Sequence, residues 1–138
     1  MKTILLPLCA QVILTLLVWL WMYYTRLTTL AKSKARTQDL ADDKKFDAIL
    51  KDVVNPSDNL ENLFEMPVLF YVACIVLFIT NSVDSPYLGL AWAFVGFRTV
   101  HSIIHCFSNI IIYRFSAYLL SSIVLWTIWI RISIFALS

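Results

Sequence analysis

Long apolar runs alternate with shorter polar segments along this chain of 138 residues. Four runs, over residues 3–24, 60–80, 86–107 and 115–137, are each about twenty residues long. An α-helix of that length rises about 30 Å, the thickness of the hydrocarbon core of a bilayer. The alternation typical of β-strands is missing, which argues against a transmembrane barrel. The pattern therefore predicts an all-α integral membrane four-helix bundle, with residues 1–138 in one domain.

Two segments carry signals for the ends of these helices. In SDNLE, ahead of the second run, Asp58 and Glu61 predict a capping box with Asp58 as N-cap. Pro86 follows the NSVDS segment and suits the first turn of the third helix, where a backbone N–H has no helical partner. We expect a tight turn between the second and third helices.

Composition and charge agree with a membrane location and add an orientation. Hydrophobic residues make up 60% of the chain, and a net charge of +2 is too small to suggest a nucleic-acid partner. Most of the Lys and Arg residues lie in the long polar loop over residues 26–59. The positive-inside rule places this loop in the cytoplasm and both termini outside. The loop is also expected to contact anionic lipid headgroups. A bacterial inner membrane and an endoplasmic reticulum membrane both fit.

The cysteine and histidine pattern predicts no metal site. Cys9, Cys74 and Cys106 lie in or beside apolar runs, without the paired spacing of a disulfide scaffold or a zinc site. His101 and His105 share one helix, whereas haem in a bundle generally takes ligands from facing helices. A symmetric oligomer could supply such a pair, so haem ligation stays an alternative at this point.

The third run contains polar residues that a lipid-facing helix would exclude. The spacing places four of them on one helical face, namely Arg98, His101, His105 and Asn109. An arginine at the centre of a lipid-facing helix costs about 2.5–3.5 kcal/mol on insertion scales. We therefore expect this face to contact other helices or a hydrated cavity.

The second run offers a partner for Arg98. Asn62 and Glu65 are three residues apart near its cytoplasmic start, and Glu65 is the only acidic residue well inside an apolar run. An unpaired carboxylate is costly at that depth. The long side chain of Arg98 can extend toward the same boundary. We predict a Glu65–Arg98 ion pair, which either only fixes the register of the helices or frames a site.

Each remaining polar residue has a structural alternative to a functional role. His101 can donate a hydrogen bond between helices, and His105, near the cytoplasmic end, can be hydrated. Arg114 and Arg131 can extend to the two membrane boundaries. Taken by themselves, these residues leave a structural and a functional interpretation open.

Together the motifs resemble the MAPEG family, the membrane-associated proteins in eicosanoid and glutathione metabolism. The resemblance covers nearly the whole chain in length, in its four apolar runs and in the long loop after the first. Its most specific parts are NLFEMPVLFY in the second run and FRTVHSIIH in the third. Asn62, Glu65 and Pro67 match the family's Asn-x-x-Glu shortly before a proline.

The resemblance implies a homotrimer with thiol-dependent transferase or peroxidase activity on lipophilic electrophiles. Glutathione, the cosubstrate, is expected in a cleft between neighbouring subunits that opens to the cytoplasm. In that picture Arg114 stabilises the glutathione thiolate and His105 is an auxiliary donor, and these two are the catalytic candidates. The residues expected to bind the cosubstrate are Asn62, Glu65, Arg98 and His101.

Two positions depart from the family pattern. Asp58 occupies a position where members that bind glutathione well usually have an arginine, and its charge would repel a glutathione carboxylate. His105 replaces a tyrosine. These departures support a second hypothesis, a non-catalytic membrane protein that keeps the MAPEG scaffold for assembly or lipid binding.

Overall fold

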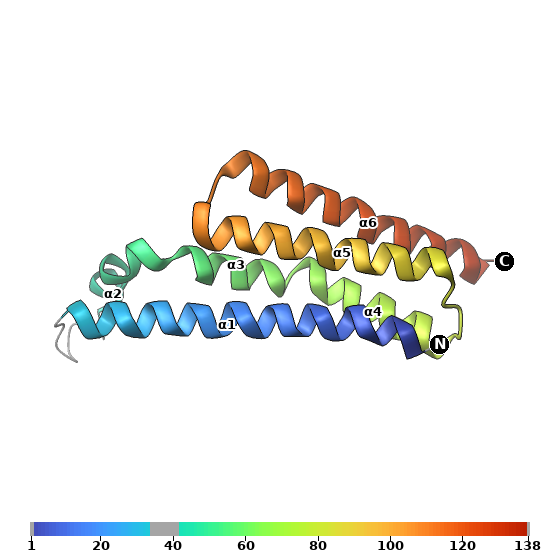
Figure 1. Ribbon diagram of the computed structural model, residues 1–138, viewed down its shortest axis with the longest axis horizontal. Coiled ribbons are helices and arrows are strands. Elements are labelled where there is room, and N and C mark those ends of the chain that lie inside the picture. Colours follow the sequence, from blue (N-terminus) through green and yellow to red (C-terminus); the bar gives the residue numbers. More distant parts are fainter. Residues whose placement is uncertain (1, 34–41, 138) are drawn as a thin grey trace.

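Four apolar helical spans run side by side along the long axis of the molecule (Figure 1). The computed structural model describes residues 2–33 and 42–137, and the regular structure in these ranges is helical. The spans are Leu5–Ser33, Asn55–Ile79, Ser85–Ser108 and Ile111–Leu137. The all-helical membrane fold predicted from the apolar runs is confirmed. The end of the bundle with both chain termini is called the termini end below, and the opposite end the α2 end (Figure 1).

The first span is longer than its apolar run. Helix α1 (Leu5–Ser33) does not end at residue 24, and its 29 residues correspond to about 43 Å, more than a bilayer core requires. The hydroxyl groups of Thr25 and Thr28 bond back to carbonyl groups one turn earlier, so these residues stay inside the helix. Lys32 in the last turn complements the negative end of the helix dipole.

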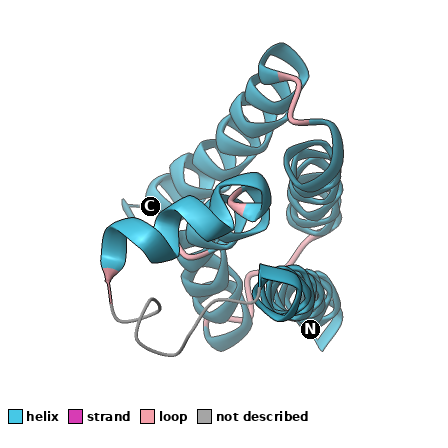
Figure 2. Cartoon of the chain, turned by 90° about the vertical axis from the view of Figure 1, so that its left-hand side faces the viewer, coloured by secondary structure: helices cyan, strands magenta, loops and turns pink. Residues whose placement is uncertain are grey.

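The segment 26–59, predicted as a loop, is largely helical where it is described. Helix α2 (Asp43–Leu50) begins at Asp42, whose side chain accepts hydrogen bonds from the backbone N–H groups of Lys44 and Lys45. A 3₁₀ turn, η3 (Lys51–Val53), follows it. Figure 2, viewed from the α2 end, shows α2 lying across the end of the bundle. The rest of the predicted loop, residues 34–41, lies outside the described residues.

The second span consists of two helices, α3 (Asn55–Leu63) and α4 (Met66–Ile79), separated by a break at Phe64 and Glu65. Pro67 lies in the first turn of α4, where its ring lacks an N–H and disfavours helical continuation from the preceding turn. The predicted start of this span was wrong. Pro56 is in the first turn of α3, so Asp58 lies inside the helix and is not its N-cap.

The third and fourth spans form an antiparallel pair around an apolar core. Helix α5 (Ser85–Ile103) starts as predicted, with Pro86 in its first turn and Asp84 as N-cap. The rings of Phe70 and Phe94 stack at 4.4 Å between centroids in the core. Most of this core lies in the half toward the termini end, and it includes Ile4, Ala73, Leu77, Ala91, Leu125 and Ile128. The core thereby fixes how α5 and α6 lie against each other.

A π-helical turn, η4 (Ile104–Ser108), ends the third span. Asn109 follows in the left-handed region at φ 48°, and its N–H donates to the carbonyl oxygen of Ile104 at 2.6 Å. Asparagine tolerates this conformation better than most other residues with a side chain. The chain therefore reverses within two residues, and α6 (Ile111–Leu137) starts at residue 111 and not at 115. Arg114 consequently lies in the first turn of α6, beside the end of α5.

Candidate functional site

The polar face of the third span is buried, as its spacing predicted. Arg98 has no exposed surface, and His101 and His105 are each 3% exposed. Ser102, on the same helix, is also buried. Since α6 packs along α5, these groups face protein and not lipid. They lie in the half of the bundle toward the α2 end.

The guanidinium group of Arg98 lies between aromatic rings and not beside a carboxylate. Its central carbon is 4.8 Å from the ring centroid of Tyr118 and 5.6 Å from that of Phe94, both within the range of cation–π attraction. Its three nitrogen atoms have no hydrogen-bond acceptor among the described residues. A buried cation without an acceptor is costly, so Arg98 is held here by the surrounding fold.

The predicted Glu65–Arg98 ion pair is not formed, although both residues are described. Glu65 lies at the break between α3 and α4 and is exposed. The prediction assumed an unbroken helix in which Asn62 and Glu65 share one face. Pro67 interrupts that helix and takes Glu65 out of register with Asn62.

His101 joins the end of α5 to the start of α6. Its Nδ1 atom lies 3.0 Å from the backbone carbonyl oxygen of Arg114, at hydrogen-bond distance. Its ring lies 5.5 Å from that of His105 and 5.8 Å from that of Tyr118, centroid to centroid. His101 thereby fixes the position of the helical turn that carries Arg114.

His105, for which a hydrated position near the cytoplasmic end was one alternative, is buried. It lies in η4, whose π-helical turn packs against α3, and its two ring nitrogens have no hydrogen-bond partner among the described residues. Its burial follows from the early reversal at Asn109, which keeps this turn inside the bundle.

Arg114 is held by a chain of amide groups. Its Nη1 atom donates to Oδ1 of Asn109 at 2.6 Å, and Nδ2 of Asn109 donates to Oδ1 of Asn55 at 3.1 Å. This chain connects α6, the turn after η4 and the start of α3. The partner of the guanidinium group is neutral, so the contact orients Arg114 without cancelling its charge.

A second amide, that of Asn59, links α3 to the third span. Asn59, with no exposed surface, accepts a hydrogen bond from the Ser102 hydroxyl at 3.3 Å and donates to the Cys106 sulfur at 3.4 Å. Sequence reasoning missed Asn55 and Asn59 because they precede the predicted start of the second helix. Their spacing with Asn62, at i, i+4 and i+7, is the signal that could have identified a shared face.

A hollow of about 250 Å³ lies beside His101 and Arg114. Its lining combines polar and apolar groups: Asn62, His101, Ile111, Arg114, Phe115 and Tyr118. It thus brings together three of the six residues predicted for the site. Arg98 and His105 lie next to it, in contact with the rings of Tyr118 and His101, and Glu65 is not part of its lining.

A comparison with protein families identifies the family of this chain. The model of the MAPEG family matches residues 4–134, nearly the whole chain. The chain belongs to the MAPEG family. Neither the curated proteins nor the solved structures compared with it gave a match. Members of the MAPEG family generally use glutathione, and the four apolar spans make this MAPEG protein an integral membrane protein.

The hollow of this MAPEG protein can hold a polar group next to an apolar one. Arg114 supplies a positive charge, Asn62 and Tyr118 supply hydrogen-bonding groups, and Ile111 and Phe115 supply apolar surface. The side-chain amide of Asn62 donates to the backbone carbonyl oxygen of Asp58 at 2.8 Å through Nδ2, which orients its Oδ1 atom. Such a lining suits an anion with a lipophilic neighbour.

Proposed function

We propose that this MAPEG protein catalyses thiol-dependent transfer or peroxide reduction on lipophilic substrates, with glutathione as the thiol. The observation that supports this most is the environment of Arg114. Arg114 lines the hollow toward the α2 end, and its guanidinium group is oriented by a neutral amide, that of Asn109. A cation fixed in this way can stabilise an anion that develops next to it.

The chemistry requires a thiolate, because the thiolate and not the thiol is the nucleophile. A free thiol with a pKa of about 8.5 is mostly protonated at neutral pH, and a neighbouring cation favours the anion. In transfer, the sulfur forms a bond to an electrophilic carbon and the leaving group departs with its electron pair. In peroxide reduction, the sulfur attacks the O–O bond and an alcohol leaves. A second glutathione then displaces water from the sulfenic acid to form the disulfide.

The other site residues have supporting roles in this proposal. Asn62 and His101, with Tyr118, bind polar groups of glutathione, and Ile111 and Phe115 contact the lipophilic substrate. Arg98 and His105 lie behind this lining. The buried N–H groups of Arg98 and the one N–H of a neutral His105, without partners among the described residues, are donors for a bound anion or for water that accompanies it.

A homotrimer with glutathione between subunits completes the proposal. Glu65 is exposed at the break in the second span, where a neighbouring subunit or glutathione can contact it. Lipophilic substrates then enter through the bilayer. The cations near the α2 end, Arg26, Lys32, Lys44, Lys45 and Lys51, support a cytoplasmic location of that end with the termini outside, in a bacterial inner membrane or the endoplasmic reticulum.

A non-catalytic scaffold or lipid-binding protein with the MAPEG fold is the second candidate. It is favoured by Asp58, which lies exposed one helical turn before Asn62. A carboxylate at this position repels the carboxylates of glutathione.

Titration of the detergent-purified protein with glutathione separates the two candidates. Binding is followed calorimetrically, and turnover by conjugation to a lipophilic aryl halide. The first candidate predicts saturable binding and conjugation, and Asp58→Arg is expected to tighten binding. Absence of both binding and conjugation at millimolar glutathione, in the parent and in Asp58→Arg, would favour the scaffold.

A further inference from the structure

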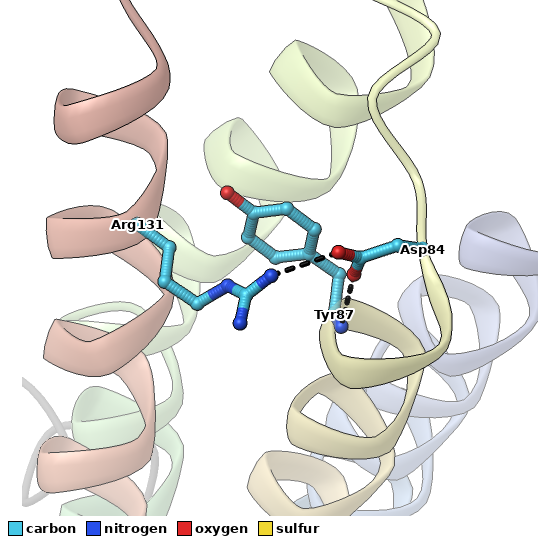
Figure 3. A network of polar contacts seen from close by, with 3 residues as sticks. All are labelled: Asp84, Tyr87 and Arg131. Atoms are coloured by element: carbon cyan, nitrogen blue, oxygen red, sulfur yellow. Dashed lines mark hydrogen bonds and ion pairs between the residues drawn. The ribbon is translucent and has the colours of Figure 1, made fainter.

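A second polar cluster lies at the termini end, far from Arg114, and comprises Asp84, Tyr87 and Arg131 (Figure 3). Nη2 of Arg131 donates to Oδ2 of Asp84 at 2.8 Å, and Oδ1 of Asp84 accepts the backbone N–H of Tyr87 at 2.8 Å. The guanidinium carbon of Arg131 lies 4.6 Å from the ring centroid of Tyr87. One positive and one negative charge are thus fixed side by side, where α5 begins and α6 approaches its end.

Both charges face an open hollow. The side chains of Arg131 and Asp84 are 39% and 47% exposed. The hollow beside them has a volume of about 440 Å³ and is lined by Ser82, Asp84, Tyr87, Arg131, Ile134 and Phe135. A smaller apolar hollow of about 190 Å³ adjoins it and shares Ser82, Tyr87 and Phe135 with it. A polar opening therefore leads to an apolar groove between α4 and α6.

The position of the cluster along the spans selects an amphiphilic ligand. The third span, Ser85–Ser108, has 24 residues and is about 36 Å long, slightly more than the hydrocarbon core. Its start is therefore at the boundary between acyl chains and headgroups. A molecule with a polar head and an acyl chain can reach both hollows from within the leaflet.

The charges of Asp84 and Arg131 limit which headgroups can bind in the hollow. Asp84 repels a purely anionic headgroup, and Arg131 repels a purely cationic one. A carboxylate has about four acceptor sites, and Asp84 uses one on each oxygen in the contacts above. Nη1 of Arg131 takes no part in the bond to Asp84 and points away from it in Figure 3, so it can donate to a headgroup. A headgroup that carries both a phosphate and an ammonium matches this pair.

We propose that the termini-end hollow binds a phospholipid whose headgroup combines a phosphate with a primary ammonium. The phosphate contacts Arg131, the ammonium donates to Asp84, and one acyl chain occupies the apolar groove between α4 and α6. A trimethylated ammonium cannot donate these hydrogen bonds and binds less well. This site is independent of the glutathione site, and either can exist without the other.

The test is lipid retention by the full-length protein, measured by native mass spectrometry after exchange into micelles doped with one phospholipid at a time. The probes are phosphatidylethanolamine, phosphatidylcholine and phosphatidylglycerol with identical acyl chains. We expect retention of the ethanolamine lipid to exceed that of the other two by about fivefold, as one additional charge-assisted contact predicts. Lys32→Gln, which removes an exposed cation near the α2 end, is the matched control and should leave the retention of all three lipids unchanged.

Two variants identify the residues responsible. Arg131→Gln removes the phosphate contact. In this variant, retention of the ethanolamine lipid should fall to the level that the parent protein shows for the choline lipid. Asp84→Asn keeps the N-cap of α5, so the fold survives, but leaves the charge of Arg131 unbalanced. We expect Asp84→Asn to shift the preference to the anionic glycerol lipid.

Several results would overturn this proposal. Equal retention of the three lipids by the parent protein is one. Another is an unchanged lipid preference in Asp84→Asn, which would make the ion pair only a contact between helices. A third is efficient disulfide cross-linking between subunits through Ser82→Cys, because a second copy would then cover the hollow.

Discussion

Arg114 and Arg131 lie on the same helix, α6, and differ in their partners. Arg131 bonds to a carboxylate, that of Asp84, so its charge is balanced. Arg114 bonds to the neutral amide of Asn109, so its charge is oriented but not balanced. The comparison teaches that residue type alone does not assign a role to an arginine in a membrane helix. The charge of its nearest partner decides whether it can stabilise another anion.

The surroundings of the two arginines also differ in polarity. The half of the bundle toward the termini end contains most of the apolar core, with Phe70 and Phe94 stacked at its centre. Buried polar atoms without a partner among the described residues occur in both halves, for example at Gln11 near the termini end, but Arg98, His101 and His105 gather such atoms on one helix toward the α2 end. Unsatisfied buried donors weaken a fold, and they are retained where a ligand or water uses them. This grouping on one helix is the reason for taking the half toward the α2 end as the candidate site.

The largest effect is expected from Arg114→Gln. The variant keeps a side chain that can bond to Asn109 but removes the positive charge. We expect kcat/KM for glutathione conjugation to fall about 10²-fold, the usual cost of losing one group that stabilises an anion. Steady-state conjugation of a lipophilic aryl halide measures this. Arg131→Gln is the matched control on the same helix, and an equal loss in that variant would refute the comparison.

Asn109→Asp gives Arg114 the kind of partner that Arg131 has. Aspartate also tolerates the left-handed backbone conformation, so the turn before α6 should persist. We expect kcat/KM to fall about tenfold, corresponding to roughly 1.4 kcal/mol. Asn109→Gly is the control, since it removes the hydrogen bond without adding a charge and should cost less. A larger loss in Asn109→Gly would show that orientation matters more than charge.

His101→Phe tests the contact that positions the start of α6. It removes the hydrogen bond to the carbonyl group of Arg114, at a cost of about 1 kcal/mol of stability, and should lower conjugation only a few-fold. Thermal unfolding in detergent and steady-state kinetics measure the two effects. Thr99→Val is the control, because among the described residues the Thr99 hydroxyl bonds only to the carbonyl group of Val95 within α5. Equal losses of stability and conjugation in the two variants would show that His101 does not position the start of α6.

Asp84→Asn makes the environment of Arg131 resemble that of Arg114 and should have the smallest effect. The ion pair is partly exposed, so its loss should cost less than about 1 kcal/mol. We expect a small decrease in the midpoint of thermal unfolding and unchanged conjugation kinetics. A loss of conjugation would mean that the two ends of α6 are coupled.

Much of the fold could be predicted from the sequence because lipid leaves few choices. Runs of apolar residues of bilayer length must be helices, and the stripe from Arg98 to His105 had to face protein. The family was also recognisable from its motifs. What failed were the ends of helices, where Pro56 and Pro67 act locally against the apolar pattern.

The candidate site was predicted only in part. Asn62, His101 and Arg114 do line one hollow. The Glu65–Arg98 ion pair was wrong because the prediction treated the second span as one helix. Asn55 and Asn59 were missed because a hydropathy pattern ends the span before them, although α3 continues through both. Hydropathy thus locates the spans and does not determine the polar contacts at their ends.

The ultraviolet absorbance of the glutathione thiolate tests the central claim most directly, since the claim concerns the charge of Arg114 and not turnover. Glutathione is added at neutral pH to the parent protein, Arg114→Gln and Arg131→Gln, and the difference spectrum is recorded for each. We predict thiolate absorbance in proportion to the protein in the parent and in Arg131→Gln, and none in Arg114→Gln. Thiolate absorbance that persists in Arg114→Gln, or that is missing from the parent, would contradict the account.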